Sequence, residues 1–253
     1  MTSNEASFAP NYNSLERLIS TVHQSGYIQS RFDDPEVSNE GPRFYWRFDV
    51  DISPPSAQKI GRILTAKEVQ GNFFFLLDGE SYNVFTPTNI EILNELRSNG
   101  HLVGLHVNEP MVGTDEIAIA QTLDWFQSVV TPIDNAVSFH RPSPNVLGKR
   151  YSAFLSAYDP RFFGQGIYFS DSRRSFAFME GLESKLKEAD DDLQLLLHPV
   201  WWYPVSGVNS LYELLVARRR REFDEYLETN FKRVFGEALS NEDRSPRMQV
   251  DNV

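Results

Sequence analysis

The segment from Arg43 to Asp51, with the sequence RFYWRFDVD, constrains the fold of this chain more than any other stretch. It is rich in aromatic residues and ends in two carboxylates, which is typical of a strand that delivers polar groups at its end. The alternation of a strand places Arg47, Asp49 and Asp51 on one face. Two acids this close repel each other unless a cation or a shared proton relieves them. A solvated strand end is the alternative interpretation.

The rest of the chain alternates between the strand and helix patterns of apolar residues. Strands are predicted over residues 43–51, 72–77, 101–106, 135–139, 166–171 and 193–197. Helices are predicted over residues 15–25, 54–70, 87–99, 115–130, 176–188 and 210–239. Strict alternation predicts parallel strands with right-handed crossovers, in an open doubly wound sheet or a closed barrel. Six strands are few for eight full β/α units, so we expect an α/β fold with an irregular, distorted parallel β/α barrel.

The length of 253 residues suits one α/β domain. We expect an N-terminal arm and helix over residues 1–42 and the barrel over residues 43–205. A C-terminal helix packed on the barrel, followed by a polar tail, is predicted over residues 206–253.

Composition excludes several classes of partner. The chain has 35 acidic and 24 basic side chains and a net charge of −11, which argues against nucleic acid and anionic membranes. It has no cysteine, so a disulfide framework and a thiolate metal site are both excluded. Because its start does not resemble a signal peptide and no apolar run approaches the ~20 residues of a spanning helix, we expect a cytoplasmic protein without membrane insertion. The oligomeric state is left open.

Polar side chains stand at the end of one predicted strand after another. In parallel α/β folds the carboxyl ends of the strands meet at one edge, where working residues collect. We therefore expect six side chains to gather there: Asp49, Asp51, His106, His140, Asp171 and His198.

Five short motifs resemble those of the polysaccharide deacetylases of the NodB-homology family. They are FDVD, GHLVGLH, FHRPSP, YFSDS and LLLHP, and they occur in the family's order between Arg43 and Trp202. The HRPS stretch and the HPVWW stretch are most similar to the intracellular subgroup that acts on surface-polysaccharide precursors. The resemblance implies a distorted β/α barrel and a divalent metal ion, for which Zn²⁺ is the expectation.

The resemblance also implies roles for individual residues. Asp49 would be the catalytic base, and Arg141 would orient it. His198 would be the general acid, with support from Asp171. Trp201 and Trp202 would form an apolar or stacking wall for a sugar ring, unless they belong to the core.

For the metal, the resemblance implies Asp51 and His106 as ligands. The chain departs from the family at Pro110, which stands where a second histidine of that motif is usual and has no ligand atom. Glu109 and Asn108 are alternatives, and we favour His140 as the third ligand. One carboxylate and two imidazoles suit a Zn²⁺-like ion with an open position.

The function that these residues imply is metal-dependent hydrolysis of an amide C–N bond. The substrate would be the acetamido group of a sugar, a nucleotide-sugar or a polysaccharide precursor, which would be N-deacetylated. One alternative is a catalytically inactive carbohydrate-binding or scaffold homologue without metal. Another is an amidohydrolase that acts on a small or cyclic amide, since a shared fold does not fix the substrate.

Overall fold

The computed structural model describes residues 9–35 and 41–241. The first eight residues of the predicted N-terminal arm and the polar tail after residue 241 lie outside this part. The chain divides into two compact units, residues 1–202 and residues 203–253.

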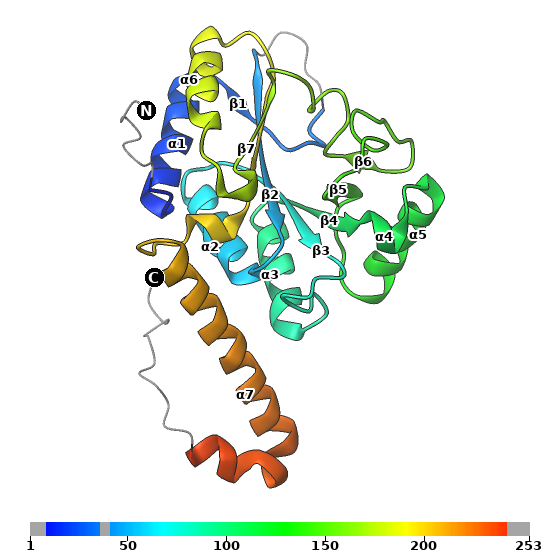
Figure 1. Cartoon of the computed structure of the whole chain (residues 1–253). Helices are drawn as coiled ribbons and strands as arrows, with labels where there is room; N and C mark the ends of the chain where they lie inside the picture. Colours follow the sequence, from blue (N-terminus) through cyan, green and yellow to red (C-terminus); the bar gives the residue numbers. More distant parts are fainter. Residues whose placement is uncertain (1–8, 36–40, 242–253) are drawn as a thin grey trace. The chain divides into compact units, whose positions relative to one another are not determined.

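One sheet of parallel strands forms the centre of the first unit (Figure 1). The strands are β1 (Ile28–Gln29), β2 (Arg43–Val50), β3 (Asn72–Leu76), β4 (Leu102–Asn108), β5 (Ala136–His140), β6 (Leu155–Ser156), β7 (Tyr168–Ser170) and β8 (Leu193–Leu197). Their order is β6-β5-β4-β3-β2-β8-β7, and β1 pairs with the start of β2. Within the described residues no ladder joins β6 to β7, so hydrogen bonds between strands do not close the ring.

The sheet curls toward itself across its interior. Gln194 of β8 donates hydrogen bonds from its amide to the carbonyls of Ala157 and Phe162, at 3.1 and 2.8 Å, although both follow β6 at the other end of the strand order. A parallel sheet that curls in this way and stays open is an irregular β/α barrel. The predicted fold class is therefore confirmed.

The helices of this unit begin at the capping signals in the sequence. Ser53 caps α2 and Thr86 caps α3, and a proline occupies the first turn of each, where no backbone N–H is needed. The helices are α1 (Tyr12–Gln24), α2 (Pro54–Ala66), α3 (Pro87–Ser98), α4 (Glu109–Val112), α5 (Glu116–Val129) and α6 (Phe178–Glu188), with 3₁₀ turns η1 (Ser172–Arg174) and η2 (Pro199–Trp202).

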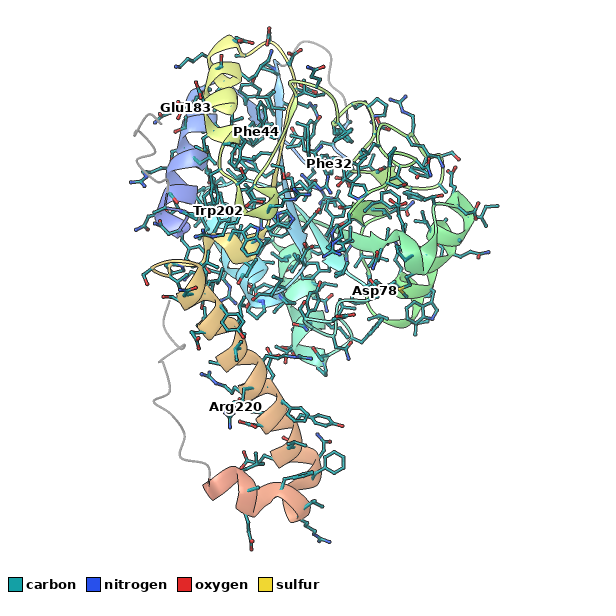
Figure 2. The ribbon with its side chains drawn as sticks, in the orientation of Figure 1. Phe32, Phe44, Asp78, Glu183, Trp202 and Arg220 are labelled. Carbon is teal, nitrogen blue, oxygen red and sulfur yellow. The ribbon has the colours of Figure 1, made fainter. Side chains whose placement is uncertain are left out.

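The interior of the curled sheet changes from apolar to polar along the strands. The apolar part is a buried cluster that includes Phe32, labelled in Figure 2, and is completed by Tyr45, Phe74, Leu102, Ala136, Ala157 and Phe162. Tyr45, Arg47 and Asp49 succeed one another on the same face of β2, so the strand passes from this cluster into charged residues. The polar groups thus lie toward the carboxyl ends of the strands.

Gly104 allows β4 and β5 to lie close together at this point. A Cβ atom there would lie 2.3 Å from the carbonyl oxygen of Ala136 and 3.0 Å from the ring of Phe74. Such contacts with backbone cannot relax by rotation of a side chain, so only glycine fits this position.

Two strands were not predicted. β1 and β6 have two residues each, which is too short for a periodic pattern of apolar residues. β6 is positioned by pairing with β5, which is a tertiary interaction.

The second unit contains the long helix α7 (Val208–Asn241), close to the predicted 210–239. Its helical geometry is interrupted at Phe231, where φ is −134° and ψ is 27°. Its predicted packing on the barrel stays a prediction. Among the described residues, no helix has both the length and the apolar character needed to cross a membrane.

Candidate metal centre and acid–base pair

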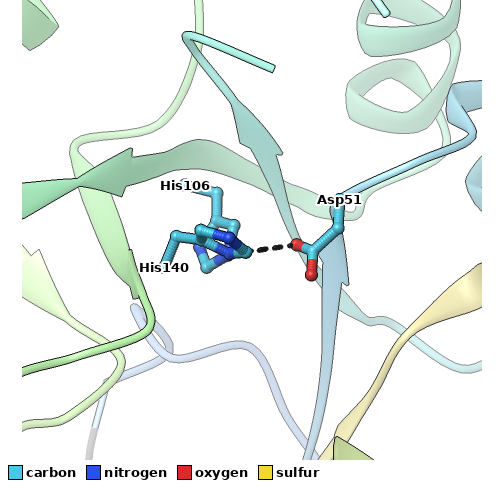
Figure 3. Close-up of side chains that lie close together, drawn as sticks. All are labelled: Asp51, His106 and His140. Atoms are coloured by element: carbon cyan, nitrogen blue, oxygen red, sulfur yellow. Dashed lines mark hydrogen bonds and ion pairs between the residues drawn. The ribbon is translucent and has the colours of Figure 1, made fainter. Parts of the chain in front are cut away.

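Three predicted metal ligands meet at the carboxyl ends of the strands. Asp51 follows β2, His106 lies in β4, and His140 is the last residue of β5 (Figure 3). The Nε2 atom of His106 is 3.2 Å from Oδ1 of Asp51 and 3.2 Å from Nδ1 of His140. The third side of this triangle, between Asp51 Oδ1 and His140 Nδ1, is 3.7 Å.

These three atoms fit a small divalent cation. Ligand atoms about 2.0–2.1 Å from a tetrahedral Zn²⁺ lie roughly 3.3 Å from one another, which is close to the observed sides. The Oδ1 atom of Asp51 is buried without a hydrogen-bond partner among the described residues. A cation would satisfy this oxygen, so the residues present fit the metal that the sequence predicts.

The charge states of these side chains also suit a cation. Burial raises the pKa of Asp51, but the adjacent imidazole of His106 outweighs burial and leaves that pKa below its ordinary value. Burial and the neighbouring His106 lower the pKa of His140. Asp51 is therefore ionised and His140 neutral at neutral pH, which are the forms that bind metal.

Behind the candidate metal centre, Asp49 is paired with Arg47 of the same strand. Arg47 donates from Nε and Nη2 to the two carboxylate oxygens at 3.0 and 2.7 Å. Both residues are almost inaccessible, with 0% and 3% of their side chains exposed. Burial raises the pKa of Asp49, but the Arg47 guanidinium outweighs burial and brings that pKa to about 2. Asp49 is thus a buried, permanent anion.

The guanidinium of Arg47 has further partners in the barrel interior. Its Nη2 atom lies 2.6 Å from the hydroxyl of Ser138 and 2.9 Å from that of Tyr158. Its Cζ atom lies 4.4 Å from the centre of the Tyr158 ring. A buried cation needs such partners on every side because no water reaches it.

A second acid–base pair lies at the ends of β7 and β8. Nδ1 of His198 is 2.6 Å from Oδ1 of Asp171, and the indole N–H of Trp202 donates to Oδ2 of Asp171 at 2.9 Å. Burial lowers the pKa of His198, but the hydrogen bond and charge of Asp171 outweigh burial and raise that pKa to about 9. The other ring nitrogen, Nε2, lies 3.7 Å from Oδ2 of Asp51. This pair therefore holds a proton beside the candidate metal centre.

Arg141 does not reach Asp49. It is exposed at the end of β5, where its backbone adopts a left-handed conformation with φ of 49°. The guanidinium that holds the carboxylate of Asp49 belongs to Arg47, not to Arg141 as predicted. The sequence contained a signal for this, because Arg47 precedes Asp49 by two residues and so shares its face of β2.

The alternative ligands near Pro110 have other interactions in the structure. Glu109 accepts a hydrogen bond from the backbone N–H of Ser143 at 2.6 Å, which fixes the HRPSP loop. Asn108 pairs opposite His140 in the β4–β5 ladder. The third atom of the converging group belongs to His140, and its role as a ligand stays a prediction.

The two tryptophans of the HPVWW stretch differ. Trp202 is fully buried, so it belongs to the core and does not offer a face to a sugar. This corrects its assignment as a wall for substrate. Trp201 is half-buried, and its ring centre lies 6.4 Å from that of His198, so it borders the site.

Together the fold and the site define a parallel β/α barrel protein with a candidate Asp–His–His metal centre. No family model and no curated protein sequence matches the chain. The solved structures similar to it include three that match at low sequence identity and with a TM-score below 0.5.

The first is a peptidoglycan deacetylase of Bdellovibrio bacteriovorus, with 17% identity, a TM-score of 0.40 and coverage of 77% of this chain. The alignment covers 53% of that protein, so this chain spans about half of its length. The second is a peptidoglycan deacetylase from Bacillus subtilis, with 16% identity, a TM-score of 0.43 and coverage of 76% and 99% of the two chains. The third is a family 4 carbohydrate esterase from Bacillus anthracis, with 13% identity, a TM-score of 0.40 and coverage of 81% and 86%.

Proposed function

We propose that this chain is a metal-dependent hydrolase of an amide C–N bond. The observation that carries the proposal is the triangle of donor atoms from Asp51, His106 and His140, with the His198–Asp171 pair beside it. Amide hydrolysis requires polarisation of the carbonyl, an acceptor for the proton of the attacking water, and a proton for the leaving amine. This edge of the barrel has a place for a Lewis acid, an ionised carboxylate in Asp49 and a proton donor in His198.

Asp51, His106 and His140 would hold the divalent ion. When bound, the ion supplies Lewis-acid polarisation of the amide carbonyl and lowers the pKa of water. His198 carries a proton at neutral pH because Asp171 stabilises its charged form. Its Nε2 faces the candidate metal centre and donates that proton to the departing amine, which cannot leave as an anion.

Asp49 has the role of base in the family that the motifs resemble. In this chain its carboxylate oxygens accept hydrogen bonds from Arg47 and Ser138, and its pKa of about 2 makes it a weak proton acceptor. We therefore propose that Asp49 serves first as the buried anion that holds these donors in place. Any base function would depend on the oxygen lone pairs that Arg47 leaves available.

The substrate that we propose is an acetamido sugar within a carbohydrate, with Zn²⁺ as the metal. Support comes from the five sequence motifs and from a site whose donors match amide chemistry. A small or cyclic amide remains the alternative substrate.

The test uses untagged protein, because a polyhistidine tag would bind metal. The protein is stripped with a chelator, reloaded with Zn²⁺ or Co²⁺, and assayed for acetate released from N-acetylglucosamine oligomers. We expect release only after reloading. His140→Ala should abolish it, whereas His23→Ala, which changes an exposed histidine on α1, should not.

Absence of acetate release from the reloaded protein would contradict the sugar substrate. If a cyclic amide is hydrolysed instead, the metal-dependent reaction survives with another substrate. If no amide is hydrolysed and the wild-type protein binds no metal, the chain is a non-catalytic homologue.

A further inference from the structure

We propose that Ser138 is a positioning residue for the candidate metal centre. Its hydroxyl connects the buried Arg47–Asp49 pair to His106 and fixes which nitrogen of His106 carries the ring proton. The inference deepens the proposed function, because it concerns how this chain prepares one of its own ligands for the cation.

The register of the sheet places Ser138 at the centre of the network. It lies directly opposite His106 in the β4–β5 ladder. Its Oγ atom is 2.9 Å from Nδ1 of His106, 2.6 Å from Nη2 of Arg47, and 3.1 Å from each oxygen of Asp49. One hydroxyl thus contacts three functional side chains from three different directions.

A count of protons determines the direction of each hydrogen bond. The guanidinium of Arg47 can only donate, and the ionised carboxylate of Asp49 can only accept. The single proton of the Ser138 hydroxyl therefore goes to Asp49, and its lone pairs face Arg47 and His106. Nδ1 of His106 must then carry a proton, since two acceptors would repel each other at 2.9 Å.

This tautomer is the one that a cation requires. With the proton on Nδ1, neutral His106 presents the lone pair of Nε2 toward Asp51 and His140. The opposite tautomer would direct an N–H bond at the same point and exclude the cation. Ser138 and His106 are 0% and 2% exposed, so the hydroxyl and the ring interact with each other rather than with bulk solvent.

Mutation of a residue that hydrogen-bonds the second ring nitrogen of a metal-bound histidine typically lowers metal affinity by about 10–100-fold. We therefore expect Ser138→Ala to weaken the binding of Co²⁺ or Zn²⁺ by about 10–100-fold in calorimetric titration. Ser138→Thr, which keeps the hydroxyl, should retain most of the affinity. Ser30→Ala is the matched control, because Ser30 is also buried but its hydroxyl makes only a 3.4 Å contact with a backbone carbonyl.

A second measurement does not depend on the fold of any variant. Nitrogen-15 chemical shifts of His106 in metal-free wild-type protein should report a protonated Nδ1. A neutral ring with its proton on Nε2 would overturn the inference, and so would unchanged affinity in a folded Ser138→Ala protein. Failure of the wild-type protein to bind metal would instead contradict the proposed function, because the tautomer is measured without metal.

Discussion

At the scale of single residues, Asp49 shows how burial changes the meaning of a mutation. Its carboxylate neutralises Arg47, and both side chains lie where no water can replace a lost partner. A buried ion pair adds little net stability, because desolvation of the two charges offsets their attraction. Removal of one partner is nevertheless strongly destabilising, since it leaves the other charge buried and unpaired.

Asp49→Asn should therefore destabilise the fold by about 3–5 kcal/mol, because the amide offers Arg47 one acceptor and no charge. Denaturant unfolding measures the change. Asp33→Asn is the matched control, since Asp33 receives the same two-pronged contact from Arg31, at 2.8 and 2.6 Å, but is 44% exposed. The Asp33→Asn substitution should lower the free energy of unfolding by less than about 1 kcal/mol. Equal losses in the two variants would contradict this view of Asp49.

The second prediction at this scale concerns the proton on His198. In metal-free protein its pKa should lie near 9, because Asp171 accepts its Nδ1–H bond. Asp171→Asn removes the charge, so the pKa of His198 should fall toward or below about 6.5. The charged form would then be lost as pH rises through the neutral range. Titration of the histidine signals by NMR measures both values, and an unchanged pKa in the variant would contradict the pairing.

At the scale of elements, His101 joins α2 to the start of β4. Its Nδ1 accepts the backbone N–H of Gly71 at 3.1 Å, so its Nε2 carries the proton toward the carbonyl of Gly61 at 3.0 Å. Burial lowers the pKa of His101 from 6.5 to about 4. Between about pH 4 and pH 6.5, His101 is therefore neutral in the folded protein, whereas the same side chain is protonated in the unfolded chain.

The stability that comes from burying neutral His101 is fully present above about pH 6.5 and is lost progressively as pH falls toward about 4. Its full size is about 3 kcal/mol. His101→Gln, which does not titrate, should remove this part of the pH dependence. The measurement is the free energy of unfolding of both proteins at pH 7 and pH 4.5. Identical pH dependence in the variant and the wild type would contradict the prediction.

The contact between β4 and β5 gives another prediction for an element. Gly104→Ala should destabilise the protein by at least about 1–3 kcal/mol, because its Cβ would overlap the backbone of Ala136. Gly164→Ala is the control, since a Cβ there would meet only a side chain, at 3.4 Å. Thermal unfolding of the two variants measures the difference. A Gly104→Ala protein as stable as the control would show that the strands can separate at no cost.

At the scale of the whole molecule, the sequence predicted the alternating fold because apolar periodicity and helix caps are local signals. It also predicted that Asp51, His106 and His140 would lie near one another, since parallel strands end at one edge. Their convergence within 4.8 Å is a feature of the structure, and their role as ligands stays a prediction.

Other parts of the site depend on contacts that are not local in sequence. Ser138 matters because the register places it opposite His106, and no pattern in the sequence specifies that register. Tyr158 reaches Arg47 only because the sheet curls. The assignment of Arg141 followed the order of motifs, whereas its left-handed backbone at the end of β5 leaves it away from Asp49.

Diffraction from metal-loaded crystals, recorded at the absorption edge of zinc, tests the candidate metal centre most directly. We expect one anomalous peak about 2.0–2.2 Å from Oδ1 of Asp51, Nε2 of His106 and Nδ1 of His140. A peak bound to other residues, or no peak among these three atoms in fully loaded protein, would contradict the proposed metal-dependent hydrolase.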